Sequence, residues 1–306
     1  MSRTVSFVSL GLLCLVWGST WPIIKIGLEA IPPFLAAGVR FLIAGIILFG
    51  LSWVQGVRQP QTFRAHFGLL CIGLGIGLSY GAVYWGQQYI PAGLSAVLFA
   101  TNPLFVMLLA HVAVDSEAIT WRKFVGVLLG FFGVVFIFQD DLQLPNRLNV
   151  IGAAVTLISP FVVSLSNVGI KKWGYHFHPY NLTALPMTYA AALLLVVSFW
   201  SENVAHVSWT PAALSSVLYL SIVGSVFGFV IFYSLLKQFP VSTLAFASYV
   251  FPVVALALGY VLLGETLEMQ ALVGGSAILV GIIVATRGGT AVTNRLWGMI
   301  DVDVTE

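Results

Sequence analysis

Long apolar runs separated by short polar stretches fill almost the whole chain. Most runs approach the ~20 residues that a helix needs to cross the ~30 Å hydrocarbon core of a bilayer. They predict ten membrane-spanning helices, over residues 5–26, 33–54, 66–88, 91–113, 121–138, 148–170, 178–200, 211–236, 240–263 and 268–286. Because the polar stretches are too short to hold an inserted soluble domain, the pattern predicts an all-α polytopic membrane protein.

Composition agrees with this fold class. Of the 306 residues, 59% are hydrophobic and only 8% are charged, whereas about a quarter of a soluble domain is charged. The net charge of +2 and the absence of a basic run give no indication of nucleic acid as a partner. Cys14 and Cys71 both lie inside apolar runs, so we expect packing residues and no disulfide framework.

One stretch of the chain occurs twice. At one constant offset, Pro91 matches Pro240, Ala96 matches Ala245 and Pro103 matches Pro252; after a one-residue slip, Glu117 matches Glu265, Val125 matches Val273, Gly126 matches Gly274 and Gly133 matches Gly281. Prolines and glycines at the same places in two helices indicate an internal duplication. The halves it predicts cover residues 7–138 and 149–286, followed by a tail over 287–306 that we expect to be cytoplasmic.

The duplication has a geometric consequence, because each half holds five spans. With an odd number of spans, the second half must enter the membrane upside down relative to the first. Inverted repeats of this kind are typical of secondary transporters, which hold substrate near the bilayer midplane between the repeats. The alternative is an old duplication that is retained for packing alone.

Lysine and arginine predict the orientation, because cytoplasmic loops carry an excess of them. With both termini inside, ten of the thirteen fall on the cytoplasmic side: Arg3, Arg58, Arg64, Arg122, Lys123, Lys171, Lys172, Lys237, Arg287 and Arg295. Arg147 falls outside. The asymmetry predicts ten spans with both termini cytoplasmic.

Two cations lie within the predicted spans, Lys25 near the outer end of the first and Arg40 in the second. Intramembrane charges usually face a cavity or a partner, so the pair predicts an outer vestibule that attracts a carboxylate or another anionic group. The alternatives are snorkelling to the interface or, for Lys25, pairing with Glu29. No Asp or Glu lies well inside a span, so a coupling proton would travel on the substrate, on His111 or on an acid at a helix end.

Polar and aromatic groups gather where the spans cross the midplane. Mid-span prolines remove backbone hydrogen bonds and kink helices, which leaves carbonyls that need partners. We therefore expect a chamber for a small amphipathic molecule, with Pro103 and Pro252 as hinges. The residues expected to line it are Trp17, Tyr80, Trp85, Asn102, Asn167 and Tyr249. Helix packing alone is the other interpretation of such a cluster.

Enzyme-like and metal-like patterns are weak. The sequence from Gly77 to Gly81 reads G-x-S-x-G, but that motif requires a strand-to-helix turn with a base and an acid nearby. His176 and His178 flank Phe177 without a third ligand, so we expect no metal there. The sequence therefore predicts no enzyme, no catalytic residue and no cofactor.

The chain resembles the EamA-type transporters of the drug/metabolite transporter superfamily. The resemblance rests on Trp17-Gly18 followed by Lys25, on the Pro103 helix that ends at Glu117, and on its copy from Pro252 to Gly264-Glu265. It covers nearly the whole chain as two units. It implies ten helices in inverted five-helix repeats, alternating access, and export of small metabolites, often amino acids, across the bacterial inner membrane.

The interpretation that unites these observations is a secondary active transporter, an exporter of small metabolites such as amino acids, that is multi-pass in the bacterial cytoplasmic membrane. Its partners would be a small-molecule substrate, the lipid bilayer and, where a proton gradient drives transport, a coupling proton. A passive facilitator or channel and a non-transporting membrane scaffold are the alternatives. Two departures from the family pattern leave the substrate open: Asp115-Ser116-Glu117 where Leu-Gly-Glu is common, and Pro160 with Asn167 in the sixth span.

Overall fold

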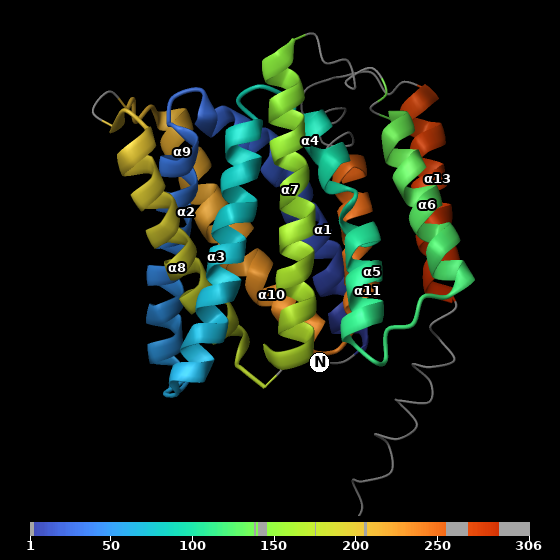
Figure 1. Ribbon diagram of the computed structural model, residues 1–306, viewed down its shortest axis with the longest axis horizontal. Coiled ribbons are helices and arrows are strands. Elements are labelled where there is room, and N and C mark those ends of the chain that lie inside the picture. Colours follow the sequence, from blue (N-terminus) through green and yellow to red (C-terminus); the bar gives the residue numbers. More distant parts are fainter. Residues whose placement is uncertain are drawn as a thin grey trace, which may run out of the picture.

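The computed structural model describes residues 3–137, 139, 146–174, 176–204, 207–254 and 269–287, and their regular structure is entirely helical (Figure 1). The helices of the first half are α1 (Arg3–Leu28), α2 (Pro33–Val54), α3 (Phe63–Gly86), α4 (Ala92–Phe99), α5 (Asn102–Ala113) and α6 (Trp121–Ile137). Those of the second half are α7 (Arg147–Gly169), η2 (Ile170–Gly174), α8 (Pro179–Ser201), α9 (Pro211–Tyr219), η4 (Leu220–Phe227), α10 (Gly228–Leu236), α11 (Val241–Ala245) and α13 (Met269–Arg287). Each of the ten predicted spans contains helix, although the end of the ninth, residues 255–263, lies outside the described residues.

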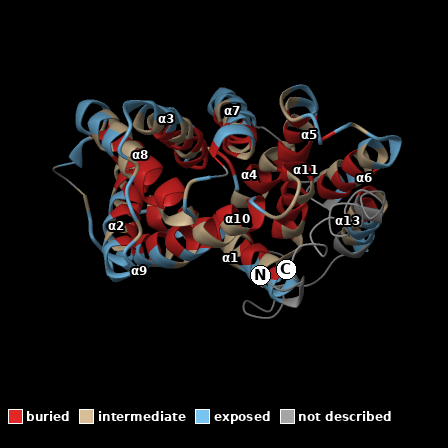
Figure 2. Cartoon of the chain, turned by 90° about the horizontal axis from the view of Figure 1, so that it is seen from below, coloured by how far each residue is buried: buried red, intermediate tan, exposed pale blue. Residues whose placement is uncertain are grey.

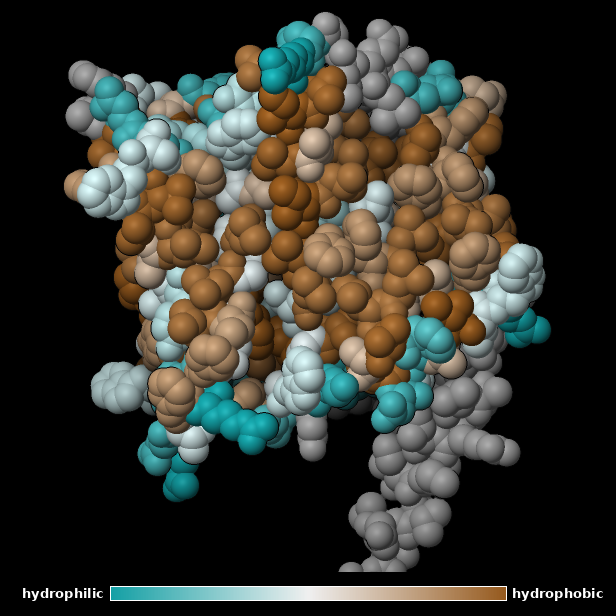
Figure 3. Space-filling model, viewed as in Figure 1, coloured by the Kyte–Doolittle hydropathy of each residue, from teal (hydrophilic) through white to brown (hydrophobic). Residues whose placement is uncertain are grey.

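The surface is that of a multi-pass membrane protein. Seven helices of the described chain are long and apolar enough to cross a bilayer, and shorter apolar helices cover Val241–Val254 and Val273–Ala285. A broad hydrophobic band crosses the middle of the molecule, and hydrophilic residues collect at its upper and lower edges (Figure 3). Exposed tryptophans such as Trp53, Trp121 and Trp200 stand near helix ends, where the membrane–water interface favours amphipathic rings.

The two halves run in opposite directions. In Figure 1, α1 begins at the lower edge beside the N-terminus, whereas α7, the first helix of the second half, begins at the upper edge. The helix ends near Arg58, Arg122, Lys171 and Lys237 lie at the lower edge, so the basic residues gather on that side.

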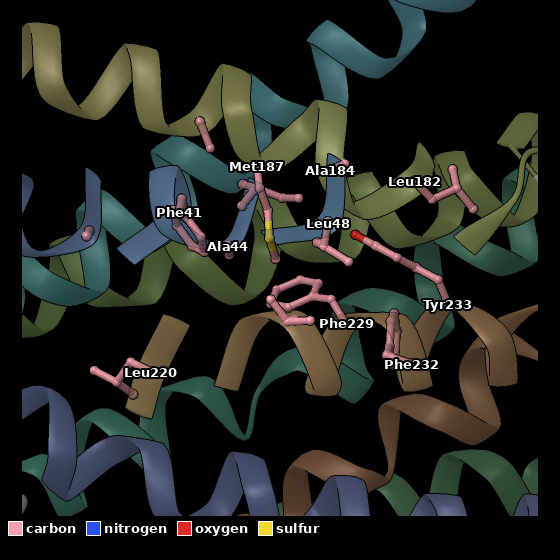
Figure 4. Close-up of a cluster of buried hydrophobic side chains, with 14 of the residues drawn as sticks. Phe41, Ala44, Leu48, Leu182, Ala184, Met187, Leu220, Phe229, Phe232 and Tyr233 are labelled. Carbon is pink, nitrogen blue, oxygen red and sulfur yellow. The ribbon is translucent and has the colours of Figure 1, made fainter. Parts of the chain in front are cut away.

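A stripe of glycines brings α3 close to α8. A Cβ atom on Gly73 would lie 2.6 Å from the carbonyl oxygen of Pro186, and one on Gly77 would lie 3.3 Å from the Cα of Ala190. Glycines four residues apart share one helix face, and this face lets the two backbones approach closely. Much of the buried core lies beside this contact, between α2, α8 and α10, where Phe229, Phe232 and Tyr233 face Leu48 and Met187 (Figure 4).

Helices α6 and α13 form a separate pair at one end of the molecule (Figure 2). A Cβ atom on Gly126 would lie 2.5 Å from the carbonyl oxygen of Gly281, and one on Gly133 would lie 2.8 Å from that of Gly274. The sequence matches Gly126 with Gly274 and Gly133 with Gly281. Each helix therefore offers the same patch to the other, as the two partners of a two-fold interface do.

Two predicted spans are irregular near the middle of the molecule. The fourth is divided into α4 and α5 by a turn at Ala100 and Thr101. The eighth contains the π-helix η4 between α9 and α10. π-helical turns are rare and often occur at functional sites. The break in the fourth span lies between Phe99 and Asn102, which both line the site described below.

Candidate functional site

A cavity lies between the two halves, with an empty volume of about 820 Å³, its open mouth included. Its wall combines aromatic rings with a few uncharged polar groups. The rings are Trp17, Trp21, Tyr80, Phe99, Phe229, Phe232 and Phe251, and the polar residues are Thr20, Asn102, Ser159, Asn167 and Ser248. Four of the residues that the sequence predicts for the substrate path, Trp17, Tyr80, Asn102 and Asn167, are brought together here.

Trp17 forms the wall between α1 and α10. Its indole N–H donates to the carbonyl oxygen of Gly224 at 3.1 Å, and its ring centroid lies 5.3 Å from that of Phe229. A Cβ atom on Gly228 would collide with the indole nitrogen, so the bare helix surface there makes room for the ring. Gly224 belongs to η4, and the irregular turn supplies the acceptor that a buried tryptophan needs.

Asn102 connects the first half to the second through Pro160. Its Nδ2 atom donates to the carbonyl oxygen of Pro160 at 3.3 Å and to Ser164 Oγ at 2.9 Å. Beside it, the hydroxyls of Ser79 and Ser159 lie 2.7 Å apart. A proline inside α7 disturbs the regular hydrogen bonding there, and these side chains give the polar groups partners inside the protein.

Arg40 lies behind the cavity wall, outside its lining. The side chain is 1% exposed; Nε donates to Ser225 Oγ at 2.9 Å, and Nη1 donates to Tyr84 Oη at 3.2 Å. Its guanidinium lies 5.0 Å from the ring centroid of Tyr80, whose side chain lines the cavity. The cation is thus held by hydroxyls and ring faces, which favours a role in positioning the wall over one in an open vestibule.

Lys25 also lies outside the lining and holds the end of α3. Its Nζ atom donates to the carbonyl oxygen of Gln87 at 2.5 Å and contacts that of Ile90 at 3.4 Å. In the second half, Lys171 donates to the carbonyl oxygens of Leu236 at 2.7 Å and Phe239 at 2.8 Å. Leu236 and Phe239 follow Gln87 and Ile90 by the same offset that relates Pro240 to Pro91. The two lysines therefore make equivalent contacts in the two halves.

The other predicted site residues lie in supporting positions. Trp85 is half-buried and packs on Tyr89, with ring centroids 4.9 Å apart. Tyr249 is fully buried and its hydroxyl donates to the carbonyl oxygen of Val127 at 2.8 Å. Pro103 stands in the first turn of α5, directly after the break in the fourth span, and Pro252 is buried beyond α11. Hinge motion at the two prolines stays a prediction.

Glu117 differs from what the sequence suggests. It lies between α5 and α6, where a charged residue is expected to be solvated, yet it is 3% exposed. Its carboxylate accepts the backbone N–H of Val241 at 2.5 Å and the hydroxyl of Ser242, and Lys123 Nζ stands 3.7 Å away. Val241 lines the cavity. An acid of the first half therefore holds a wall element of the second half.

Trp21 is the second residue that sequence reasoning missed. It lines the cavity, is 7% exposed and packs on Val83 and Ala96. The signal was present, because Trp17 and Trp21 are four residues apart and so share one face of α1.

The arrangement offers binding groups, and the enzyme-like motif does not have the turn that its chemistry requires. Ser79 of the G-x-S-x-G pattern lies inside the continuous helix α3, away from any strand-to-helix turn. Within the part of the chain that the structure describes, no three His, Cys, Asp or Glu side chains come together as metal ligands.

A family model decides the classification. The model of the EamA-like transporter family matches residues 6–139 and 150–287, one unit for each half. The chain belongs to the EamA-like transporter family. As an EamA transporter it is a membrane transport protein and not an enzyme, and the cavity lies between the two EamA units.

Named relatives cover nearly the whole EamA chain. It is 30% identical over 285 residues to the "Uncharacterized transporter YoaV" of Bacillus subtilis, covering 91% of this chain and 96% of that one. It is 29% identical to a "Probable amino-acid metabolite efflux pump" of Salmonella typhimurium, covering 94% and 96%. The "Uncharacterized inner membrane transporter YedA" of Escherichia coli K12 is 27% identical, covering 92% and 90%.

A solved crystal structure shares the fold. It superposes with a TM-score of 0.79 at 19% sequence identity and covers 95% of this chain and 99% of that chain. At this identity the likeness concerns the fold alone.

Proposed function

We propose that this EamA transporter is a secondary active exporter of small metabolites such as amino acids. In this proposal two inverted five-helix repeats rock around the central cavity and expose it to each side of the membrane in turn. The observation that carries the proposal is the cavity itself, because both halves line it with aromatic rings and amides. Such a chamber at the repeat interface is where secondary transporters hold their substrates.

The relation between the halves supports the inverted arrangement. They run in opposite directions, Lys25 and Lys171 make equivalent contacts, and the glycines of α6 and α13 contact one another reciprocally. The basic residues at one edge support cytoplasmic termini. The relatives' printed names, an amino-acid metabolite efflux pump and an inner membrane transporter, support export and a bacterial inner-membrane location.

Within this proposal, Trp17, Tyr80, Asn102 and Asn167 form the substrate path. Lys25, Arg40, Trp85 and Tyr249 hold the surrounding helices in place.

Uptake into inside-out membrane vesicles tests the proposal. A labelled panel of amino acids, nucleosides and aromatic metabolites is offered with and without an imposed pH gradient. Asn102→Ala should reduce transport strongly because it removes the contacts to Pro160 and Ser164 in the cavity wall. Trp53→Phe, at an exposed position outside the cavity, serves as the control and should leave transport unchanged.

Saturable accumulation that depends on the gradient supports active export and identifies the proton as the coupling ion. Flux that stops at equal concentrations would indicate a facilitator or channel. Folded protein without flux of any compound, together with a stable partner on pull-down, would indicate a scaffold subunit.

A further inference from the structure

The indole ring of Trp21 carries one hydrogen-bond donor, its N–H group. Its Nε1 atom is buried and makes no hydrogen bond with any residue that the structure describes. The side chain is 7% exposed, lines the cavity, and packs on Phe99 with ring centroids 5.4 Å apart. Buried tryptophan N–H groups usually find a partner, and each exception in a native structure requires an explanation.

Trp17, on the same face of α1, also lines this cavity, and its indole N–H is hydrogen-bonded within the protein. Its N–H is occupied by the carbonyl oxygen of Gly224, and its ring is surrounded by Phe229, Phe232 and Phe251. Trp17 therefore completes the wall with contacts from the protein alone. Trp21 lines the same space, but its donor finds no acceptor among the described residues, and an acceptor on a molecule in the cavity would complete it.

The charge of the cavity limits what that acceptor can be. None of the described residues that line the cavity carries a formal charge. Arg40, the cation behind Tyr80, already binds Ser225 and Tyr84. An ion taken from water into this space would lose its hydration without direct contact with a lining group of opposite charge, and such a transfer is far more costly than that of a neutral polar group.

The remaining lining groups fit an uncharged molecule with a ring. The amide of Asn167 makes no hydrogen bond with the residues described and can both donate and accept. The rings of Phe99, Tyr80 and Phe229 offer faces and edges on which a planar apolar group packs favourably. Together the wall provides uncharged hydrogen-bonding groups, among them Trp21 and Asn167, and a large aromatic remainder.

We propose that Trp21 is a substrate-binding residue whose indole N–H donates to an uncharged oxygen acceptor, and that the cavity selects neutral, ring-bearing molecules such as aromatic amides and alcohols over carboxylates. The inference rests on the proposed transport of small metabolites, and for the same cavity it puts uncharged, ring-bearing molecules in place of the zwitterionic amino acids.

Three probes that share one ring test the ligand class on the full-length protein in nanodiscs. They are 3-phenylpropanamide, which is neutral, 3-phenylpropanoate, which is an anion, and phenylalanine, which is a zwitterion. Binding is measured by equilibrium dialysis of labelled probe, with protein-free nanodiscs to subtract partition into lipid. The expected result is that the amide binds at least about tenfold more tightly than either charged probe.

The Trp21→Phe variant tests the hydrogen bond, because it removes the N–H and retains a ring. Its affinity for 3-phenylpropanamide should fall by about 3–10-fold, the effect of one hydrogen bond. The exposed Trp53→Phe is the matched control and should bind like the wild type. Unchanged thermal unfolding of Trp21→Phe separates the loss of a ligand contact from a packing defect.

Equal or tighter binding of either charged probe, or no binding of the amide, would overturn the ligand class. Unchanged affinity of Trp21→Phe would overturn the role of its N–H. Saturable vesicle transport of an amino acid alongside these results would leave the transport function standing, whereas absence of all saturable transport would refute that function itself.

Discussion

The carboxylate of Glu117 accepts a hydrogen bond from the backbone N–H of Val241 at 2.5 Å and so joins the loop before α6 to the first residue of α11. The two residues come from different halves of the molecule. The side chain of Val241 lines the cavity, so the position of one cavity wall depends on an acid outside the cavity. If the two halves move relative to each other during transport, this contact must either break or move as a unit with both residues.

Replacing Glu117 should therefore loosen that wall. In Glu117→Ala the N–H of Val241 and the hydroxyl of Ser242 lose their acceptor, and we expect a loss of about 2–5 kcal/mol for breaking a buried charged contact. A cysteine at the lining position of Ser248 should then react several-fold faster with a membrane-impermeant thiol reagent.

The labelling experiment is run with Cys71 replaced by serine, because that cysteine is exposed. Glu117→Gln retains an acceptor and should show a smaller increase. Equal labelling of Ser248→Cys in all three backgrounds would contradict the positioning role of Glu117.

The α6–α13 contact should tolerate no added side-chain atom. In Gly126→Ala the new Cβ would lie 2.5 Å from the carbonyl oxygen of Gly281, and backbone cannot yield as a flexible side chain does. We expect about 1–3 kcal/mol of destabilisation, seen as a lower midpoint of thermal unfolding in detergent. Gly275→Ala on α13, where a Cβ meets nothing within 4 Å, is the control and should leave the midpoint unchanged or raised.

Lys25 and Lys171 should respond alike to neutralisation. Lys25→Met leaves the carbonyl oxygens of Gln87 and Ile90 without their donor, and Lys171→Met does the same to Leu236 and Phe239. Each change should lower stability by about 1–3 kcal/mol, measured by thermal unfolding. The exposed Lys172→Met should change the midpoint little, and a neutral result for only one of Lys25→Met and Lys171→Met would argue against the equivalence of their contacts.

The N-terminus of α8 should weaken in acid. His178 Nδ1 accepts the backbone N–H of Tyr180, and burial together with the positive charge of Lys237 holds the pKa of His178 below 6.5. Because the folded-state pKa is lowered, this stabilisation is complete above the unfolded-state pKa of about 6.5 and is lost as pH falls below it. The thermal midpoint of the wild type should therefore be lower at about pH 5 than at about pH 8. This difference should be smaller in His178→Asn, because asparagine keeps a capping acceptor that does not titrate.

Pro103→Ala tests the break between α4 and α5. Alanine restores an N–H at a position where the chain now starts a new helix, so the fourth span should bend less readily. We expect slower turnover with substrate affinity largely intact, measured as the maximal rate and half-saturation concentration of vesicle uptake. A normal maximal rate would reject the hinge.

Length and hydrophobicity were sufficient to predict the helices; seven helices of the described chain are long and apolar enough to cross a bilayer, and shorter apolar helices lie in the ninth and tenth predicted spans. The sequence predicted Trp17, Tyr80, Asn102 and Asn167 as substrate-path residues from aromatic and amide groups in mid-span; the structure places these four in the cavity wall, and their contact with substrate stays a prediction. It missed Glu117, because its burial depends on Val241, which is distant along the chain. It predicted that Arg40 faces an outer vestibule. The contact of Arg40 with Ser225 could not be foreseen, because Ser225 lies in a π-helical turn that the hydrophobic pattern does not predict.

The reciprocal glycine contact of α6 and α13 has an exception that reveals how the halves have diverged. By the offset that matches Gly126 with Gly274, Gly130 is equivalent to Ile278 in the repeat. By the offset that matches Pro91 with Pro240, Ala100 is equivalent to Tyr249. Gly130 packs against the ring of Tyr249, while Ile278 and Ala100 belong to the same buried cluster. The small Gly130 is thus paired with the large Tyr249, whereas at the equivalent positions the large Ile278 shares a cluster with the small Ala100. Two identical subunits could not exchange volume in this way, because every substitution would appear on both sides, whereas two halves that vary independently can.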